Sequence, residues 1–348
     1  MSITNKRTAL EVLLIKVDVM IEDSPNIPDE IKSIVKAICK AYVRLTNGLI
    51  GLEHIRNICE AKFVAVDVND ESFTGSNKIL GSTKTDYDEN CKVSHIMYYV
   101  NDPEYMKLIT ILTHELGHVM TEPVPCEILK NGIYPVIKRT SAVYINCRHE
   151  EDGSLSSTGR YGFRTSDGFL EHMGSIIFED EDFINELADN GYLVGGCTYK
   201  DERLFPSRIY DEYKACFELF DYLFGGELFT FSCKTYSNNQ EIIDFVNRTK
   251  YFTVSKLLDE SNNALWALKG YEGKPGDSEF EKAFSDYDQK KQQVLLLADL
   301  LYEQMDTNLK DDEKYQELKR TYAECIYKNT LLPLDSRGQA GSSRIREG

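Results

Sequence analysis

Five residues in the first half of the chain, His114-Glu115-Leu116-Gly117-His118, have the types and spacing of a metal site. Residues four apart on a helix share one face, so His114 and His118 can direct their imidazoles at one point. Two neutral imidazoles suit Zn²⁺, which prefers nitrogen or sulfur ligands in a tetrahedron. Glu115 can reach a water on that metal and take its proton. The motif therefore predicts hydrolysis at a polarised carbonyl, with Glu115 as the base.

The residues around this motif predict a mostly buried helix. Asp102 fits the N-cap of that helix and Pro103 its first position. Two histidines and a glutamate on a buried helix are costly unless a partner satisfies them, which favours a metal site over a chance match. Apolar side chains cover most of the circumference of this helix: Leu108, Ile109, Ile111, Leu112, Leu116, Val119 and Met120.

The motif helix resembles the active-site helix of the zincin metallopeptidases, and the resemblance extends more weakly to the stretch around it. It implies an α+β fold, in which a small mixed sheet with an edge strand lies over the active-site helix. It also implies Zn²⁺ as the cofactor and a peptide or protein as the substrate. The residues beyond this catalytic part predict a mostly helical C-terminal part.

Two histidines leave a catalytic zinc ion one protein ligand short. In the gluzincin branch of the zincins a glutamate on a later helix supplies that ligand, and the resemblance implies Glu171. This residue lies in a stretch, 167–180, that predicts a helix starting near Asp167. The chain departs from the gluzincin pattern at two positions, because His172 replaces a glycine and Ser175 replaces a frequent acidic residue.

Other third ligands stay open at this point. His172 or His149 would give a site of three histidines, and Glu179 lies about two helical turns further along than Glu171. The metzincin branch is excluded, because its third histidine would fall on Val124. Glu171 could also be an ordinary carboxylate near a helix N-terminus, where the helix dipole favours negative charge.

A tetrahedral oxyanion usually needs a further hydrogen-bond donor. Tyr161 and His172 are the candidates for this role, and Arg160 and Tyr144 also fall in suitable stretches.

The residues before the motif predict two strands, at 62–68 and 92–100, separated by a polar loop at 71–90. In zincins the strand just before the active-site helix is commonly a sheet edge beside the substrate cleft. The resemblance therefore implies that 92–100 is an edge strand that can pair with an extended peptide. His95 on this strand is interpreted as structural. The segment 134–163 predicts a hairpin that covers the site.

The chain of 348 residues divides into four predicted parts. Residues 1–60 are an N-terminal helical segment, and 61–270 form the zincin-like metallopeptidase domain. Residues 271–330 form a C-terminal helical hairpin that packs on the catalytic body. Residues 331–348 are predicted to be a flexible tail, because Ser336 to Gly348 are small, polar and rich in Gly and Ser.

The composition argues against several kinds of binding partner and indicates the compartment of the protein. A net charge of −17 argues against a general affinity for nucleic acid or for anionic membrane surfaces. No apolar run is long enough for a membrane span. Nine scattered cysteines without a C-x-x-C pair favour free thiols in a reducing compartment, so we expect a cytoplasmic protein.

Two other classes of function remain open. A catalytically inactive protein with a zincin fold could bind a partner through its edge strand, although such a scaffold has no need for the base Glu115. A metal-binding protein without peptidase activity could use the same histidines, for example with iron.

Overall fold

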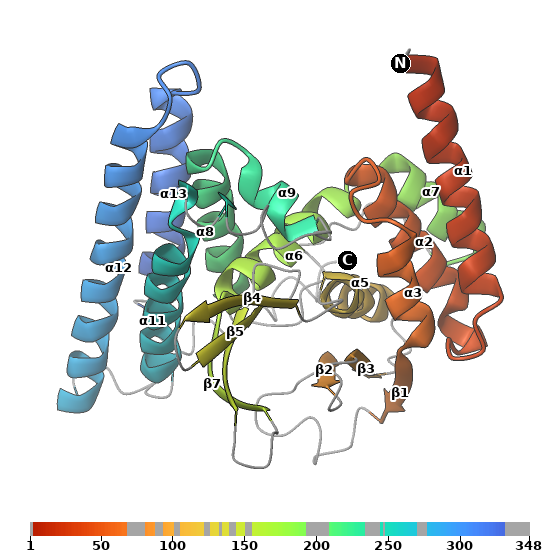
Figure 1. Cartoon of the computed structure of the whole chain (residues 1–348), viewed down its shortest axis with the longest axis horizontal. Helices are drawn as coiled ribbons and strands as arrows, with labels where there is room; N and C mark the ends of the chain where they lie inside the picture. The colour runs from red at the N-terminus through yellow and green to blue at the C-terminus, as the bar shows by residue number, and fades with distance from the viewer. Residues whose placement is uncertain are drawn as a thin grey trace, which may run out of the picture.

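The computed structural model describes part of the chain, and α-helices dominate that part (Figure 1). Its two sheets are small, so the protein belongs to the α+β class, as predicted. The described residues are 3–67, 81–87, 93–100, 105–121, 126–131, 134–138, 144–149, 155–192, 209–233, 244–245, 248–269 and 277–330.

Three helices form the N-terminal segment, as predicted: α1 (Ile3–Glu22), α2 (Asp29–Leu45) and α3 (Leu52–Glu60). Helix α2 forms where acidic residues stand in its first turn and Arg44 in its last, which complements the helix dipole. Its apolar residues recur at helical spacing and are buried: Ile31, Ile34, Val35, Ile38 and Tyr42.

The first sheet is mixed and has three described strands: β1 (Lys62–Val66), β2 (Gly81–Tyr87) and β3 (Val93–Val100). Strand β3 lies in the middle, parallel to β1 and antiparallel to β2. The prediction that 92–100 forms an edge was therefore wrong. The edge strands of the described sheet are β1 and β2. Strand β2 lies within the predicted loop 71–90, and it was not predicted because its polar residues lack the alternation that marks a strand.

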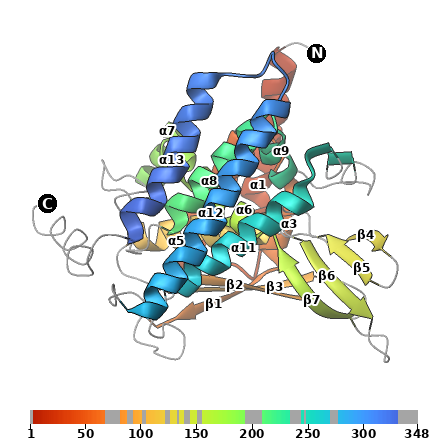
Figure 2. The same cartoon turned by 90° about the vertical axis from the view of Figure 1, so that its left-hand side faces the viewer.

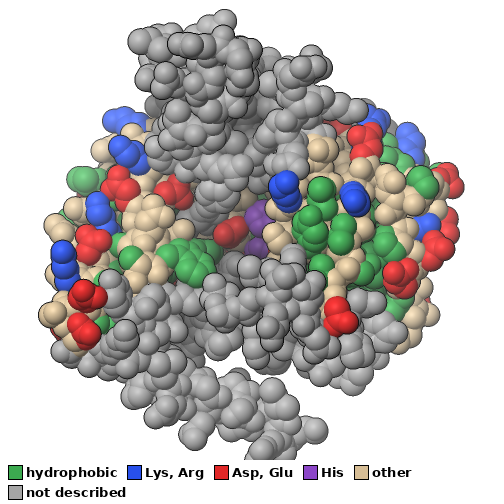
Figure 3. Space-filling view, turned by 90° about the horizontal axis from the view of Figure 1, so that it is seen from below, with side chains coloured by type: hydrophobic (Ala, Val, Ile, Leu, Met, Phe, Trp, Pro, Cys, Tyr) green, Lys and Arg blue, Asp and Glu red, His purple; other side chains and the backbone are tan. Residues whose placement is uncertain are grey.

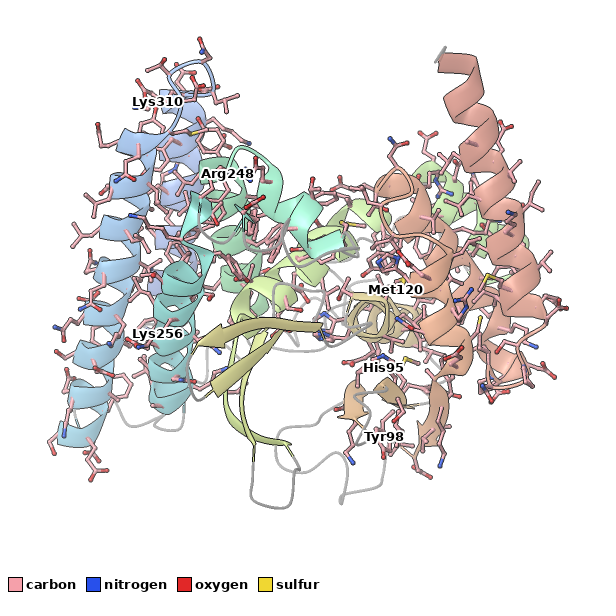
Figure 4. The ribbon with its side chains drawn as sticks, viewed as in Figure 1. His95, Tyr98, Met120, Arg248, Lys256 and Lys310 are labelled. Carbon is pink, nitrogen blue, oxygen red and sulfur yellow. The ribbon has the colours of Figure 1, made fainter. Side chains whose placement is uncertain are left out.

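The motif helix, α5 (Tyr105–Thr121), packs against β3 and β2 on one side and against α3, α2 and α6 elsewhere. Alternate side chains of β3 are buried towards this helix, which fits the period of two. His95 lies on the α5 side of the sheet and Tyr98 on the opposite side (Figure 4). The burial of His95 agrees with its structural interpretation.

The second sheet is an antiparallel meander of four strands in chain order: β4 (Cys126–Asn131), β5 (Tyr134–Lys138), β6 (Tyr144–His149) and β7 (Leu155–Tyr161). The predicted hairpin of 134–163 is confirmed in part. Strands β6 and β7 pair as a hairpin, but the first half of this segment forms a separate antiparallel strand, β5. Strand β7 then leads through Gly162 directly into the next helix.

That helix, α6 (Phe163–Ile177), begins four residues earlier than the predicted start at Asp167. Gly162 precedes it with a φ of 91°, a left-handed conformation that favours glycine. The backbone N–H of Gly162 donates to the Asp259 carboxylate at 2.6 Å. This contact comes from a distant part of the chain, so local sequence could not predict the start. Helix α7 (Glu181–Asp189) follows.

The C-terminal part is helical, as predicted, and its last two helices form a hairpin beside α8 and α11 (Figure 2). One buried apolar cluster extends from α1 to α13. Among the described residues, no helix combines the length and the apolar character needed to cross a membrane. The helices of this part are α8 (Ile209–Leu223), α9 (Glu227–Cys233), α11 (Tyr251–Lys269), α12 (Ser278–Gln304) and α13 (Asp312–Thr330).

Candidate metal centre

Helix α5 brings the two motif histidines together. His114 and His118 lie one turn apart, and their Nε2 atoms are 3.2 Å from each other. Their rings meet edge to face, at an interplanar angle of 79°. Both ε nitrogens thus point at the same small volume, as the i, i+4 spacing predicts.

A carboxylate from α6 completes this group. Oδ1 of Asp167 lies 3.4 Å from Nε2 of His118. In the described part of the chain, His114, His118 and Asp167 are the residues whose ligand atoms all lie within 4.8 Å of one another. A tetrahedral zinc ion with bonds of about 2.0–2.1 Å places two ligand atoms about 3.3 Å apart. The two short distances in this group therefore fit zinc.

Glu171, the predicted third ligand, contacts the other nitrogen of His114. Its Oε1 lies 3.2 Å from Nδ1 of that ring. The two nitrogens of an imidazole point in widely different directions, so an oxygen on Nδ1 lies away from a metal on Nε2. Asp167 and Glu171 are four residues apart on α6, and each contacts one histidine of the motif.

The group is shielded but accessible. The side chains of His114, His118 and Asp167 are 14%, 18% and 21% exposed, whereas Glu171 is 5% exposed. Figure 3 shows histidine and acidic side chains together at the bottom of a hollow near the centre of one face. A water or a substrate group can therefore reach the site, while Glu171 remains behind it.

The charges of the site perturb two pKa values. Burial acts to lower the pKa of His114, but the contact with Glu171, with help from Glu115 and Asp167, raises it to about 9. Burial raises the pKa of Asp167, and the two histidines oppose that rise. The carboxylates of Glu171, Glu115 and Asp167 therefore favour positive charge at this site.

Glu115 is buried beside β2 rather than exposed to solvent. The hydroxyl of Thr83 donates to its Oε2 at 2.8 Å. Gly81, two residues earlier on the same strand, leaves room for the glutamate, because a Cβ there would lie 2.9 Å from Cγ of Glu115. The edge strand thus packs directly on the residue predicted to be the base.

Close packing brings α5 and α6 together. Gly117, inside the motif, faces Leu170 of α6 and Tyr42 of α2. A Cβ at Gly117 would lie 2.4 Å from Cδ2 of Leu170 and 2.6 Å from the Tyr42 hydroxyl. That hydroxyl donates to the backbone oxygen of Thr113 at 3.0 Å, which fixes the helix just before the first histidine.

The remaining predicted site residues do not join this group in the described structure. Nδ1 of His172 lies 3.0 Å from Glu218, and its ring packs on Phe217, beside α8 rather than α5. Glu179 is exposed beyond the end of α6. The side chains of four other candidates lie outside the described residues: His149, Tyr144, Arg160 and Tyr161. Val124, which excluded the metzincin branch, also lies outside them.

Sequence reasoning missed Asp167 and Thr83. The signal for Asp167 was present as the spacing Asp167-x-x-x-Glu171, which presents two carboxylates on one helix face. This signal was not recognised, because the helix was expected to start at Asp167, whereas it starts at Phe163 and contains both carboxylates. Thr83 gave no local signal, since its role depends on how β2 lies over α5.

No protein-family model, curated protein or solved structure matches this chain.

Proposed function

We propose that this protein is a zinc-dependent hydrolase, of the zincin type, that cleaves peptide bonds. The observation that supports this most directly is the group of His114, His118 and Asp167, with Glu115 one residue after the first histidine. Their donors are two nitrogens and one carboxylate oxygen, a set that zinc accepts with a fourth position left open.

Asp167 is the third ligand in this proposal, in place of the glutamate expected from the gluzincin resemblance. Its oxygen lies on the Nε2 side of His118, at a distance that fits a shared metal. Glu171 lies against Nδ1 of His114 and orients that ring. A carboxylate behind a metal-binding histidine fixes its tautomer and raises its basicity. The two carboxylates of α6 thus have different roles.

A bound zinc ion would lower the pKa of a water and polarise a substrate carbonyl. Glu115 accepts the proton of that water, and its carboxylate is held in place by the Thr83 hydroxyl. The same carboxylate then donates the proton to the leaving amine, as a general acid. Only 9% of Glu115 is exposed, so its carboxylate is largely shielded from bulk water.

An edge strand of the described sheet supports a peptide as the substrate. Strand β2 is antiparallel to β3 and lies beside Glu115 at the border of the described sheet. An extended peptide can add to such an edge by main-chain hydrogen bonds. The proposal therefore places the substrate backbone along β2, with its scissile carbonyl near the histidines.

The same donor set also suits a second function. Two histidines and one carboxylate with open positions form the ligand set of non-haem iron enzymes. The Glu115 carboxylate beside the site favours the hydrolase, because proton transfer from water needs a base at this place. The metal content of the purified protein, and the effect of iron in place of zinc on peptide cleavage, distinguish the zinc hydrolase from the iron enzyme.

The experiment is peptide cleavage by purified protein loaded with one equivalent of zinc, measured by mass spectrometry on a peptide mixture. Glu115→Gln should retain zinc and lose cleavage by at least a hundredfold, because it removes only the base. His118→Ala should lose both. Zinc-loaded protein that cleaves no peptide, or Glu115→Gln with full activity, would contradict the proposed function.

A further inference from the structure

Two residues of β2 face the motif helix. Gly81 and Thr83 are two residues apart, so they share one face of the strand. A Cβ on Gly81 would lie 2.5 Å from Cγ2 of Ile111, which shows how closely β2 lies on α5. Pairing of Thr83 with Met97 of β3 sets its position along the helix.

The Thr83 hydroxyl has two acceptors on the same residue. Its Oγ1 lies 2.8 Å from Oε2 of Glu115 and 3.2 Å from the backbone oxygen of Glu115. A hydroxyl has one proton to donate and two lone pairs that can accept. It can therefore donate to the carboxylate or turn its proton to the carbonyl.

The carboxylate is the nearer of the two acceptors, so the hydroxyl donates to Oε2. This contact holds one oxygen of the carboxylate against β2 and leaves Oε1 as the oxygen that can accept a proton from water. Without the hydroxyl, Oε2 would lose its donor at a buried position, which would be costly.

We propose that Thr83 is a positioning residue for Glu115, which holds one carboxylate oxygen so that the other is directed at the reacting water. The proposal rests on the proposed function, because it gives Glu115 the role of base. It also links the strand that we expect to bind the substrate to the group that moves the proton. A peptide that pairs with β2 would act on the strand that orients the base.

The test compares Thr83→Val, which removes the hydroxyl at constant shape, with Thr83→Ser, which keeps it. Thr321→Val is a matched control, because Thr321 is an exposed threonine on α13. All three variants should bind one equivalent of zinc. If Thr83→Val does not fold, Thr83→Ala against Thr83→Ser makes the same comparison.

We expect Thr83→Val to lower kcat about tenfold with little change in KM, a fraction of the 10²–10⁴ that a general base supplies. Thr83→Ser should stay within about threefold of the wild type, since it retains the hydroxyl donor. Loss of packing alone would impair both variants and would not separate kcat from KM. Equal kcat in Thr83→Val and wild type, or no rescue by serine, would overturn the proposal.

A second readout does not depend on turnover. Acetohydroxamate loses a proton as it binds a metal site, and Glu115 can accept that proton. Its affinity for the zinc-loaded protein should fall severalfold in Thr83→Val and in Glu115→Gln, but not in Thr83→Ser. If the wild type cleaves no peptide, the proposed function fails while this comparison still tests the contact. Unchanged affinity in Thr83→Val would overturn the role of Thr83.

Discussion

Oε1 of Glu171 lies 3.2 Å from Nδ1 of His114, on the side of the imidazole away from the nitrogen that faces His118. This contact gives Glu171 the geometry of a residue that orients a ligand. Asp167, one helical turn earlier, approaches His118 instead. The two carboxylates of α6 can therefore be distinguished by experiment.

Asp167→Asn should weaken zinc binding more than Glu171→Gln does. Loss of a ligand removes a bond to the metal, whereas loss of an orienting carboxylate typically costs about 10–100-fold in affinity. Competition with a chelator of known affinity measures both variants. If Glu171→Gln abolishes binding and Asp167→Asn leaves it intact, Glu171 is the ligand and the gluzincin assignment is right.

Zinc binding should release a proton at pH 7. The pKa of His114 is raised to about 9 in the metal-free protein, so the ring is protonated there and must lose a proton to bind metal. Zinc affinity should accordingly increase with pH up to about 9. Calorimetry in two buffers with different ionisation enthalpies measures the number of protons that are released when zinc binds. Glu171→Gln should release less than the wild type, and equal release would contradict the role of Glu171.

The stability of the metal-free protein should depend on the same group. The folded-state pKa of His114 lies above its ordinary value of 6.5. The stabilisation is therefore fully present below about pH 6.5 and is lost as the pH rises through about 9. Between these pH values, the Tm of the wild type should decrease as the pH rises, and the decrease should be smaller in Glu171→Gln. A wild-type Tm that rises over this range would contradict the prediction.

Gly117→Ala should destabilise the protein by about 1–3 kcal/mol, as expected for overpacking. The new methyl would clash with Leu170 and Tyr42, which forces α5 and α6 apart. Zinc affinity should fall as well, because the ligands lie on both helices. Urea denaturation of the metal-free protein measures the free energy of unfolding. Combining Gly117→Ala with Leu170→Ala should cost less than the sum of the two changes, and strict additivity would argue against the clash.

The sequence predicted the parts of the site whose geometry is local. His114 and His118 are one helical turn apart, so their shared face follows from the helix period alone. The helices of the N-terminal and C-terminal parts were likewise predicted, since their apolar residues recur at helical spacing.

The unpredicted parts depend on contacts between distant residues. Asp259, 97 positions after Gly162, accepts the hydrogen bond that precedes α6, and this earlier start puts Asp167 within the helix. Strand β2 has polar residues, so only its pairing with β3 and its packing on α5 reveal it as an edge strand. Such contacts leave no periodic pattern in a single sequence.

Binding of zinc by His114, His118 and Asp167 together is tested most directly by a crystal structure of the zinc-loaded protein, with anomalous data on both sides of the zinc absorption edge. We expect one strong peak about 2.0–2.2 Å from Nε2 of both histidines and from a carboxylate oxygen of Asp167. A peak elsewhere, or no peak between α5 and α6 in protein loaded with zinc, would contradict it.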